Sequence, residues 1–262
     1  MTRLVSGLAL FVLAVALVWF APSWLFLVGA LGLVVAACAE YAALARHNGV
    51  AVSGVVGGLA ALITSASFSG LVDDRVLDAI LMTAFLATAV VALSRWRGQH
   101  DVLSAASAEL LPVFYIALPV GAMITLREER GREALALLML TIIVSDTAQF
   151  YTGRLFGRRL LAPRISPKKT IAGACGGFAA GIVLLAVVGA MWLPAVPLWQ
   201  RIALGAAVVA FGIAGDLFES MLKRSAGLKD SLGIIPGHGG VLDRIDALLF
   251  AAPVFYIVLR YL

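Results

Sequence analysis

Apolar residues fill this chain in long runs that short polar segments separate, a pattern typical of membrane-spanning helices. A helix needs about 17 to 25 apolar residues to cross the hydrocarbon core of a bilayer. Nine runs approach this length: Leu4–Phe20, Trp24–Ala45, Val52–Val72, Leu77–Leu93, Leu110–Leu126, Glu133–Gly153, Ile171–Leu193, Ile202–Leu222 and Ala247–Tyr261. The pattern predicts an all-α integral membrane protein, a polytopic bundle of about nine transmembrane helices.

The composition agrees with this prediction. Hydrophobic residues make up 62% of the chain and charged residues 13%, and the mean hydropathy is +1.01. These values lie outside the range of soluble globular domains. No polar segment between the runs is long enough to bury a core of its own. Any chemistry must therefore take place within the membrane or at its face.

Three features of the apolar runs have packing interpretations. Leu4–Phe20 is followed at once by another run and lacks a small-residue cleavage site, so we expect a retained helix rather than a cleaved signal. Cys38 and Cys175 both lie in apolar runs, which favours two small core residues over a disulfide or metal site. Gly173, Gly177 and Gly181 share one helix face, and we favour close packing within the monomer over a dimer contact.

The 20 basic residues are divided unequally between the two sides of the predicted bundle. The poorer side holds Arg75, Arg127, Arg130, Arg132, Arg201 and Arg260. Because positively charged loops stay in the cytoplasm, the richer side is predicted to be cytoplasmic, with the N-terminus inside and the C-terminus outside. Two segments on that side, 154–169 and 223–244, hold most of its charges, which indicates an anionic partner.

Acidic residues at membrane depth are the most informative positions. An ionised carboxylate there costs several kcal/mol unless it is paired, bound to metal or hydrated in a cavity. Asp216 and Glu219 lie one helical turn apart. The functional interpretation is favoured for the acids that share a segment with a basic loop, whereas Glu40 and Asp78 stand alone and are expected to be hydrogen-bonded or interfacial. The favoured group is Asp216, Asp243 and Asp246, while Asp146 and Glu219 are two further acids at membrane depth.

The segment KRSAGLKDSLGIIPGHGG, residues 223–240, combines basic side chains with glycines. Glycines permit positive φ angles, so such a turn can form a nest of main-chain amides that binds an anion. Carboxylates for Mg²⁺ and basic groups for phosphate stand beside it, which favours phosphoryl or nucleotidyl transfer. His238 can serve as a general base or donate a hydrogen bond to phosphate, and both roles stay open.

At these residues the chain resembles the phosphatidate cytidylyltransferase family, also called CDP-diacylglycerol synthases. The matching run is Ser220-x-Leu222-Lys223-Arg224, Lys229-Asp230, Pro236-x-His238-Gly239-Gly240 and Asp243-Arg244-x-Asp246. An upstream block is similar, with Asp146, Gly153, Arg154, Gly157, Ser166, Pro167, Lys168 and Thr170 in the family's order. Gln149 stands where an aromatic residue is expected, and Ala172 where Glu is usual. We therefore divide the chain into N-terminal helices, 1–132, and a catalytic region, 133–262.

The resemblance implies that CTP and phosphatidic acid react to give CDP-diacylglycerol and pyrophosphate, in the inner cell membrane and in phospholipid biosynthesis. Together with the charged residues, it implies a polar cavity at the cytoplasmic side of the bundle. It also implies Mg²⁺, held by Asp216, Asp243 and Asp246, and leaves a second cation open. Catalytic roles are expected for Asp216, Asp243, Lys223, Arg224 and His238. Substrate binding is expected from Asp146, Arg154, Ser166, Lys168, Lys169, Thr170, Lys229, Asp230, Gly239, Gly240 and Arg244. The expected partners are CTP, phosphatidic acid and the lipid bilayer, without nucleic acid, and a homodimer stays open.

Two other functions fit parts of the pattern. A CTP-dependent lipid kinase would use similar phosphate-binding groups but must activate a neutral alcohol, which requires a general base. A transporter would also place acids in the membrane, yet it would form no covalent product. The density of basic residues beside glycine turns favours the transferase.

Overall fold

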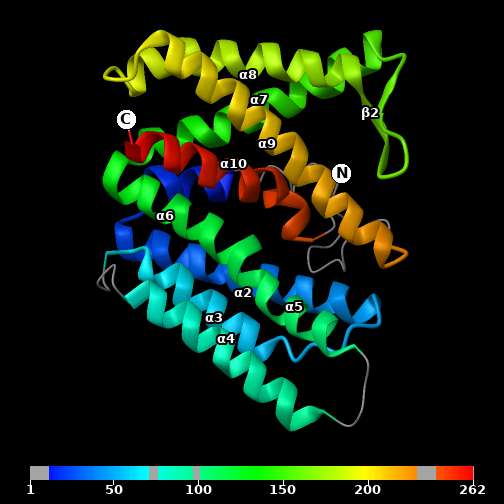
Figure 1. Cartoon of the computed structure of the whole chain (residues 1–262). Helices are drawn as coiled ribbons and strands as arrows, with labels where there is room; N and C mark the ends of the chain where they lie inside the picture. Colours follow the sequence, from blue (N-terminus) through cyan, green and yellow to red (C-terminus); the bar gives the residue numbers. More distant parts are fainter. Residues whose placement is uncertain (1–11, 71–75, 97–100, 229–239, 262) are drawn as a thin grey trace.

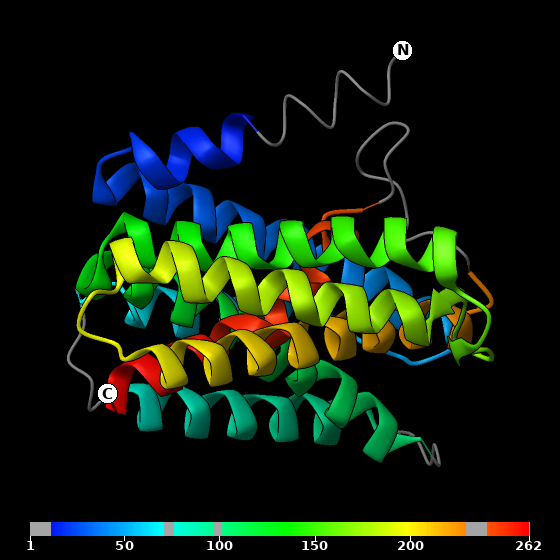
Figure 2. The ribbon, with the colours of Figure 1, turned by 90° about the horizontal axis from the view of Figure 1, so that it is seen from above.

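The structure of the protein is a computed structural model that describes residues 12–70, 76–96, 101–228 and 240–261. Its helices run side by side in one bundle (Figure 1; Figure 2). They are α2 (Ser23–His47), α3 (Val55–Ser67), α4 (Val76–Arg95), α5 (Val102–Pro112), the π-helical η1 (Val113–Ala117), α6 (Leu118–Arg130), α7 (Arg132–Phe156), α8 (Ile171–Trp192), α9 (Leu198–Ser225) and α10 (Leu242–Tyr261). The prediction of an all-α membrane protein is confirmed.

The lengths of the helices differ from the predicted runs. Among the residues that the structure describes, six helical segments are long and apolar enough to cross a membrane. The helix α3 has only 13 residues, and at 1.5 Å per residue it extends about 20 Å, less than the bilayer core of about 30 Å. The ninth run begins at Leu242 rather than Ala247, so Asp243 and Asp246 belong to the helix α10 itself. Of the first run, the structure describes a helix over residues 12–19.

The helical segment at the fifth apolar run, Leu110–Leu126, is longer than the run itself. Helix α5, η1 and α6 join into one segment, Val102–Arg130, of 29 residues, and it is the most deeply buried of the six. Pro112 lies inside it, directly before the π-helical turn. Proline lacks an N–H and its ring displaces the carbonyl four residues earlier, so a wider turn accommodates it.

One hydrophobic core joins the two halves of the chain. Its buried members include Val34 of α2, Ile116 of η1, Leu137 of α7 and Phe255 of α10. Large apolar side chains are instead exposed along α4 and α8, where a bilayer would cover them. They include Met82, Phe85, Leu86 and Val90 on α4, and Val183 and Val187 on α8.

The glycine face of α8 packs against α7. Gly173, Gly177 and Gly181 are all buried, and a Cβ added at Gly177 would lie 2.5 Å from Gln149 Cγ on α7. The interpretation of this face as packing within the monomer is confirmed. Cys38 is buried as expected, but Cys175 is exposed on α8, so its placement in the core was wrong. Helix α8 is apolar on nearly all sides, so its sequence does not show which face is buried, and Cys175 was therefore misplaced.

Three arginines at the end of α6 and the start of α7 hold neighbouring helix ends together. Arg127 Nε donates to Val18 O at 3.1 Å, and Arg132 NH1 donates to Trp19 O at 3.0 Å. Arg130 donates to Leu259 O near the end of α10. Carbonyls at a helix C-terminus lack partners within the helix and attract cations. These arginines therefore have a structural use that accounts for their presence on the charge-poor side.

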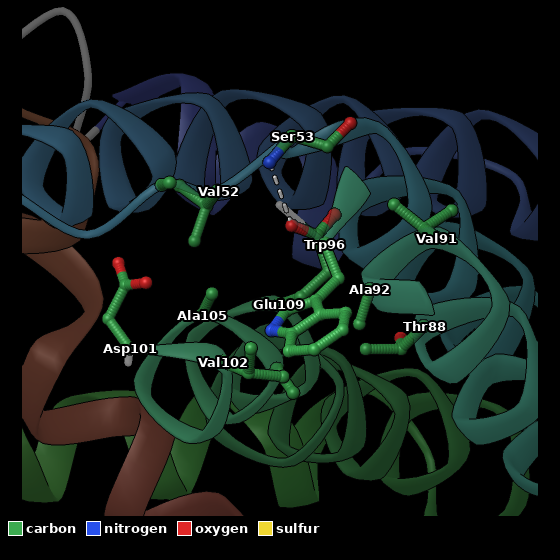
Figure 3. A pocket seen from close by; sticks show the side chains of 12 residues that line it. Val52, Ser53, Thr88, Val91, Ala92, Trp96, Asp101, Val102, Ala105 and Glu109 are labelled. Carbon is green, nitrogen blue, oxygen red and sulfur yellow. Dashed lines mark hydrogen bonds between the residues drawn. The ribbon is translucent and has the colours of Figure 1, made fainter. Parts of the chain in front are cut away.

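A buried carboxylate organises the start of α3. Glu109 of α5 is 6% exposed and accepts hydrogen bonds from the backbone amides of Ser53 at 2.9 Å, Gly54 at 3.3 Å and Gly57 at 3.1 Å. Beside it lies a cavity of about 250 Å³ between α4, α5 and the segment before α3 (Figure 3). Trp96 and Asp101 also line this cavity. Glu109 is thus satisfied by three donors and serves to fix a helix start.

Candidate active site

The predicted site residues gather at one end of the bundle. The hairpin of β1 (Leu160–Ala162) and β2 (Ser166–Thr170), the C-terminal end of α9 and the start of α10 lie at this end (Figure 1). The all-α prediction did not include this antiparallel hairpin, in which Leu160 pairs with Thr170 and Ala162 with Ser166. The hairpin replaces what would otherwise be a long loop between α7 and α8.

A glycine allows α9 and α10 to approach each other at the site. Gly215 is buried, and a Cβ added there would overlap the backbone carbonyl of Asp246. Asp216 follows Gly215 directly, so the close approach brings its helix turn beside Asp246. Both carboxylates are half-buried.

Lys223 is the centre of the first charge cluster. Its Nζ forms ion pairs with Glu219, one turn earlier on α9, and with Asp243 on α10. The side chains are 12%, 2% and 15% exposed for Lys223, Glu219 and Asp243. Asp243 Oδ2 also accepts a hydrogen bond of 2.9 Å from the amide of Gly240. One ammonium group thus offsets two carboxylates that would be costly to bury alone.

Lys169 joins the hairpin to the same region. Its Nζ lies 2.6 Å from Asp216 Oδ2, which connects β2 to α9. The next residue, Thr170, accepts a hydrogen bond of 3.0 Å at Oγ1 from Gly173 N and so caps α8. A capping side chain typically contributes about 1 kcal/mol to helix stability. Lys169 therefore ties strand β2 to α9, and Thr170 ties the end of the same strand to the start of α8.

Asp146 faces the cluster from α7. Gln149 Nε2 donates to Asp146 Oδ1 at 2.9 Å and lies 3.3 Å from Ser145 Oγ. Asp146, Asp216 and Asp246 interact electrostatically with one another and with Lys169. Gln149, which departs from the family pattern, thus orients one of these carboxylates and also packs against the glycine face of α8.

The carboxylates suit a magnesium ion in their chemistry. Mg²⁺ prefers oxygen ligands and binds through one or two carboxylates together with substrate phosphates. Within the described residues, no group of three or more His, Cys, Asp or Glu side chains is arranged as a ready metal site. Asp216 already attracts the ammonium of Lys169 at 2.6 Å, which shows that the position favours a cation. Asp216 and Asp246 offer two carboxylates from neighbouring helices, the number that Mg²⁺ typically takes from a protein.

The remaining predicted residues fall into two groups. Arg154, Lys168, Arg224 and Arg244 are exposed at this end, where they can reach an anionic ligand. Arg224 NH1 donates to Leu228 O at 3.1 Å. Ser166 is half-buried on β2. Lys229, Asp230, His238 and Gly239 lie outside the described residues.

The structure adds residues that the sequence did not assign to the site. Glu40 of α2, 2% exposed, accepts hydrogen bonds from the amides of Val241 at 2.7 Å and Leu242 at 2.8 Å, which confirms the expected hydrogen-bonded acid. Tyr115 of η1 is buried against Phe218, and its hydroxyl has no hydrogen-bond partner among the described residues. No local pattern pointed to either contact, because both join segments more than 100 residues apart.

These features define a polytopic membrane protein with an acid–base cluster at one end of its bundle, suited to phosphate-bearing ligands. The chain belongs to the cytidylyltransferase family, whose model matches residues 1–262. This match confirms the family resemblance.

Relatives in this family cover much of the chain. It is 34% identical to the phosphatidate cytidylyltransferase of Thermotoga maritima over 70% of this chain and 69% of the relative. It is 38% identical to that of Aquifex aeolicus over 56% of this chain and 54% of the relative. It is 35% identical to the phosphatidate cytidylyltransferase of Pseudomonas aeruginosa over 67% of this chain and 63% of the relative.

Proposed function

We propose that this protein transfers the cytidylyl group of CTP to phosphatidic acid and releases pyrophosphate, giving CDP-diacylglycerol. The observation that carries the proposal is the pair of contacts Lys169–Asp216 and Lys223–Asp243, which unites both family motifs at one end of the bundle. Relatives named phosphatidate cytidylyltransferase support the choice of substrates.

The chemistry requires alignment and charge neutralisation rather than a strong base. A phosphate monoester has a second pKa of about 6, so phosphatidic acid is already an anion at neutral pH. Its oxygen attacks the α-phosphorus of CTP, and the bond from that phosphorus to the pyrophosphate oxygen breaks. Bringing two anions together is the obstacle, and fixed cations at the site lower it. In this proposal, Lys168, Lys169, Lys223 and Arg224 hold phosphate oxygens as charge-assisted donors.

Magnesium would be held by Asp216 and Asp246, with Asp243 as the third candidate. A bound Mg²⁺ neutralises phosphate charge and stabilises the leaving pyrophosphate. Both oxygens of Asp243 already accept from protein donors, Lys223 and Gly240. Asp243 would have to release one of these donors to bind the ion, so its first role in this proposal is to anchor Lys223.

The membrane location follows from the substrates. Phosphatidic acid keeps its acyl chains in the bilayer while its phosphate reaches the polar end of the bundle, and CTP arrives from the cytoplasm. This assigns the hairpin, the acid cluster and the N-terminus to the cytoplasmic side of the inner membrane and the C-terminus to the outside. The charge-rich loops support this orientation, since the arginines at the opposite end are bound to helix carbonyls.

Labelled CTP distinguishes the proposal from a lipid kinase. With purified protein, Mg²⁺ and phosphatidic acid, label in the α-phosphate should enter the lipid product, and label in the γ-phosphate should appear in pyrophosphate. With diacylglycerol supplied in place of phosphatidic acid, transfer of the γ-phosphate to this lipid and release of CDP would identify a kinase instead. Exchange of lipid or nucleotide across sealed vesicles, with no covalent product, would identify a transporter.

A further inference from the structure

Glu40 connects the N-terminal helices to the start of α10. Its two carboxylate oxygens accept separate hydrogen bonds, Oε1 from Val241 N at 2.7 Å and Oε2 from Leu242 N at 2.8 Å. The side chain is 2% exposed, so no solvent competes for these donors. The first amides of a helix lack partners within it and carry the positive end of its dipole, which makes a carboxylate their best acceptor.

The same backbone segment carries Asp243. Gly240 N, one residue before the amides that Glu40 holds, donates to Asp243 Oδ2, and Asp243 Oδ1 pairs with Lys223. The contacts therefore run in sequence from Glu40 to the backbone of 240–242, then to Asp243 and to Lys223. A shift in that backbone would move both side chains.

We propose that Glu40 is a positioning residue of the active site, which fixes the backbone of Val241 and Leu242 so that Asp243 holds Lys223 in its working position. This inference rests on the proposed cytidylyl transfer. It gives the N-terminal half of the chain an indirect part in the reaction, since α2 supplies the carboxylate that holds the amides of Val241 and Leu242. Glu40 contacts no reacting atom in this assignment and acts through Asp243 and Lys223.

Glu109 provides a matched comparison. It is also a buried glutamate that accepts hydrogen bonds from backbone amides at a helix start, those of Ser53, Gly54 and Gly57. It belongs to α5 and serves α3, neither of which carries a predicted site residue. Replacing each glutamate by glutamine removes one charge and weakens one helix start, while only Glu40→Gln disturbs the site.

The test compares Glu40→Gln, Glu109→Gln and the unchanged protein in kcat, KM for CTP and thermal unfolding midpoint in detergent. Loss of a residue that orients an active group typically costs 10- to 100-fold in activity, so kcat of Glu40→Gln should fall by about that factor. Glu109→Gln should keep kcat within about twofold while its unfolding midpoint falls as much as that of Glu40→Gln. Equal kcat in the two folded variants would overturn the inference.

Hydrogen exchange separates this outcome from failure of the proposed reaction. Glu40→Gln should speed exchange of the amides of Val241 and Leu242, whereas Glu109→Gln should leave them protected. If the protein without substitutions forms no CDP-diacylglycerol, the proposed reaction is refuted. The exchange rates would still show whether Glu40 holds the amides of Val241 and Leu242. Unchanged protection in Glu40→Gln would contradict the positioning role. If Glu40→Gln does not accumulate in folded form, Glu40→Asp, with the charge kept and the reach shortened, takes its place.

Discussion

Lys169 of the hairpin and Asp216 of α9 form an ion pair with 2.6 Å between Nζ and Oδ2, and this contact joins the upstream motif block to α9, four residues before the second motif begins at Ser220. The two residues come from segments that face each other only because α7 and α8 hold the hairpin beside α9. The pair sets an ammonium group beside a carboxylate. Under the proposed function, Lys169 would hold a phosphate and Asp216 a cation, the two kinds of group that transfer between phosphate-bearing substrates uses.

Replacing Asp216 by asparagine should abolish nearly all turnover while the protein still inserts and folds. A neutral amide binds Mg²⁺ weakly and no longer attracts Lys169. Asp243→Asn should have the same effect, because it releases Lys223. Steady-state rates over a range of Mg²⁺ concentrations measure this. Asp101→Asn, at an exposed helix start where the side chain makes no capping bond, is the control and should keep the wild-type rate. Near wild-type turnover in either site variant would remove that residue from the site.

Lys168 and Lys223 should respond differently to alanine. Lys168 is exposed on β2, so Lys168→Ala should leave the unfolding midpoint unchanged. Loss of one charge-assisted hydrogen bond to phosphate should lower kcat/KM by about ten- to a hundredfold, or about 1.5–3 kcal/mol, with an unchanged Mg²⁺ dependence. Lys168→Gln with wild-type efficiency would show that this lysine only sets topology.

Lys223→Ala should also destabilise the fold. It leaves Glu219 and Asp243 without their shared cation, and breaking such a buried pair costs about 3 kcal/mol or more. Thermal unfolding in mild detergent measures the loss, with Lys168→Ala as the comparison. Equal unfolding midpoints for the two variants would show that Lys223 is not needed to neutralise this cluster.

The sequence predicted the helices and the gathering of charge, because both depend on composition within short windows. Apolar runs indicate helices in a bilayer, and acids beside basic glycine-rich loops indicate a phosphate site. The partner of Glu40 could not be predicted, since Val241 and Leu242 lie about 200 residues away and offer only backbone amides. The hairpin was missed because β2, Ser-Pro-Lys-Lys-Thr, lacks the alternation of a strand.

Helix ends were the least predictable part of the fold. Val102–Arg130 begins eight residues before the predicted run, since Ser104, Ser107 and Glu109 interrupt the apolar pattern although the backbone stays helical. Glu109 is tolerated there because three backbone amides satisfy it. A hydropathy pattern records polarity and carries no information about such partners.

Close packing between α7 and α8 predicts a sharp difference between two glycine substitutions. Gly177→Ala would place a Cβ 2.5 Å from Gln149 Cγ and 2.9 Å from Ser145 Oγ, and such overpacking costs about 1–3 kcal/mol. Gly32→Ala in α2 meets no atom within 4 Å, so it should be neutral or slightly stabilising. Unfolding midpoints of the two variants decide this. Wild-type stability of Gly177→Ala would mean that the helices are farther apart.

Cysteine labelling tests the orientation. In a background of Cys38→Ala and Cys175→Ser, a cysteine at Arg164 in the hairpin turn should react only with reagent supplied from the cytoplasm. A cysteine at Glu129, exposed near the end of α6, should react only from outside. The two sites lie at opposite ends of α7, whose 25 residues span about 37 Å. Labelling of both from one side would contradict the membrane-spanning arrangement.

The most direct test of the central claim is the product balance of the purified protein with CTP, phosphatidic acid and Mg²⁺. We predict that CDP-diacylglycerol and pyrophosphate form in equal amounts, that both require phosphatidic acid, and that Asp216→Asn forms neither. Pyrophosphate without CDP-diacylglycerol, or a phosphorylated lipid with CDP released, would contradict the account.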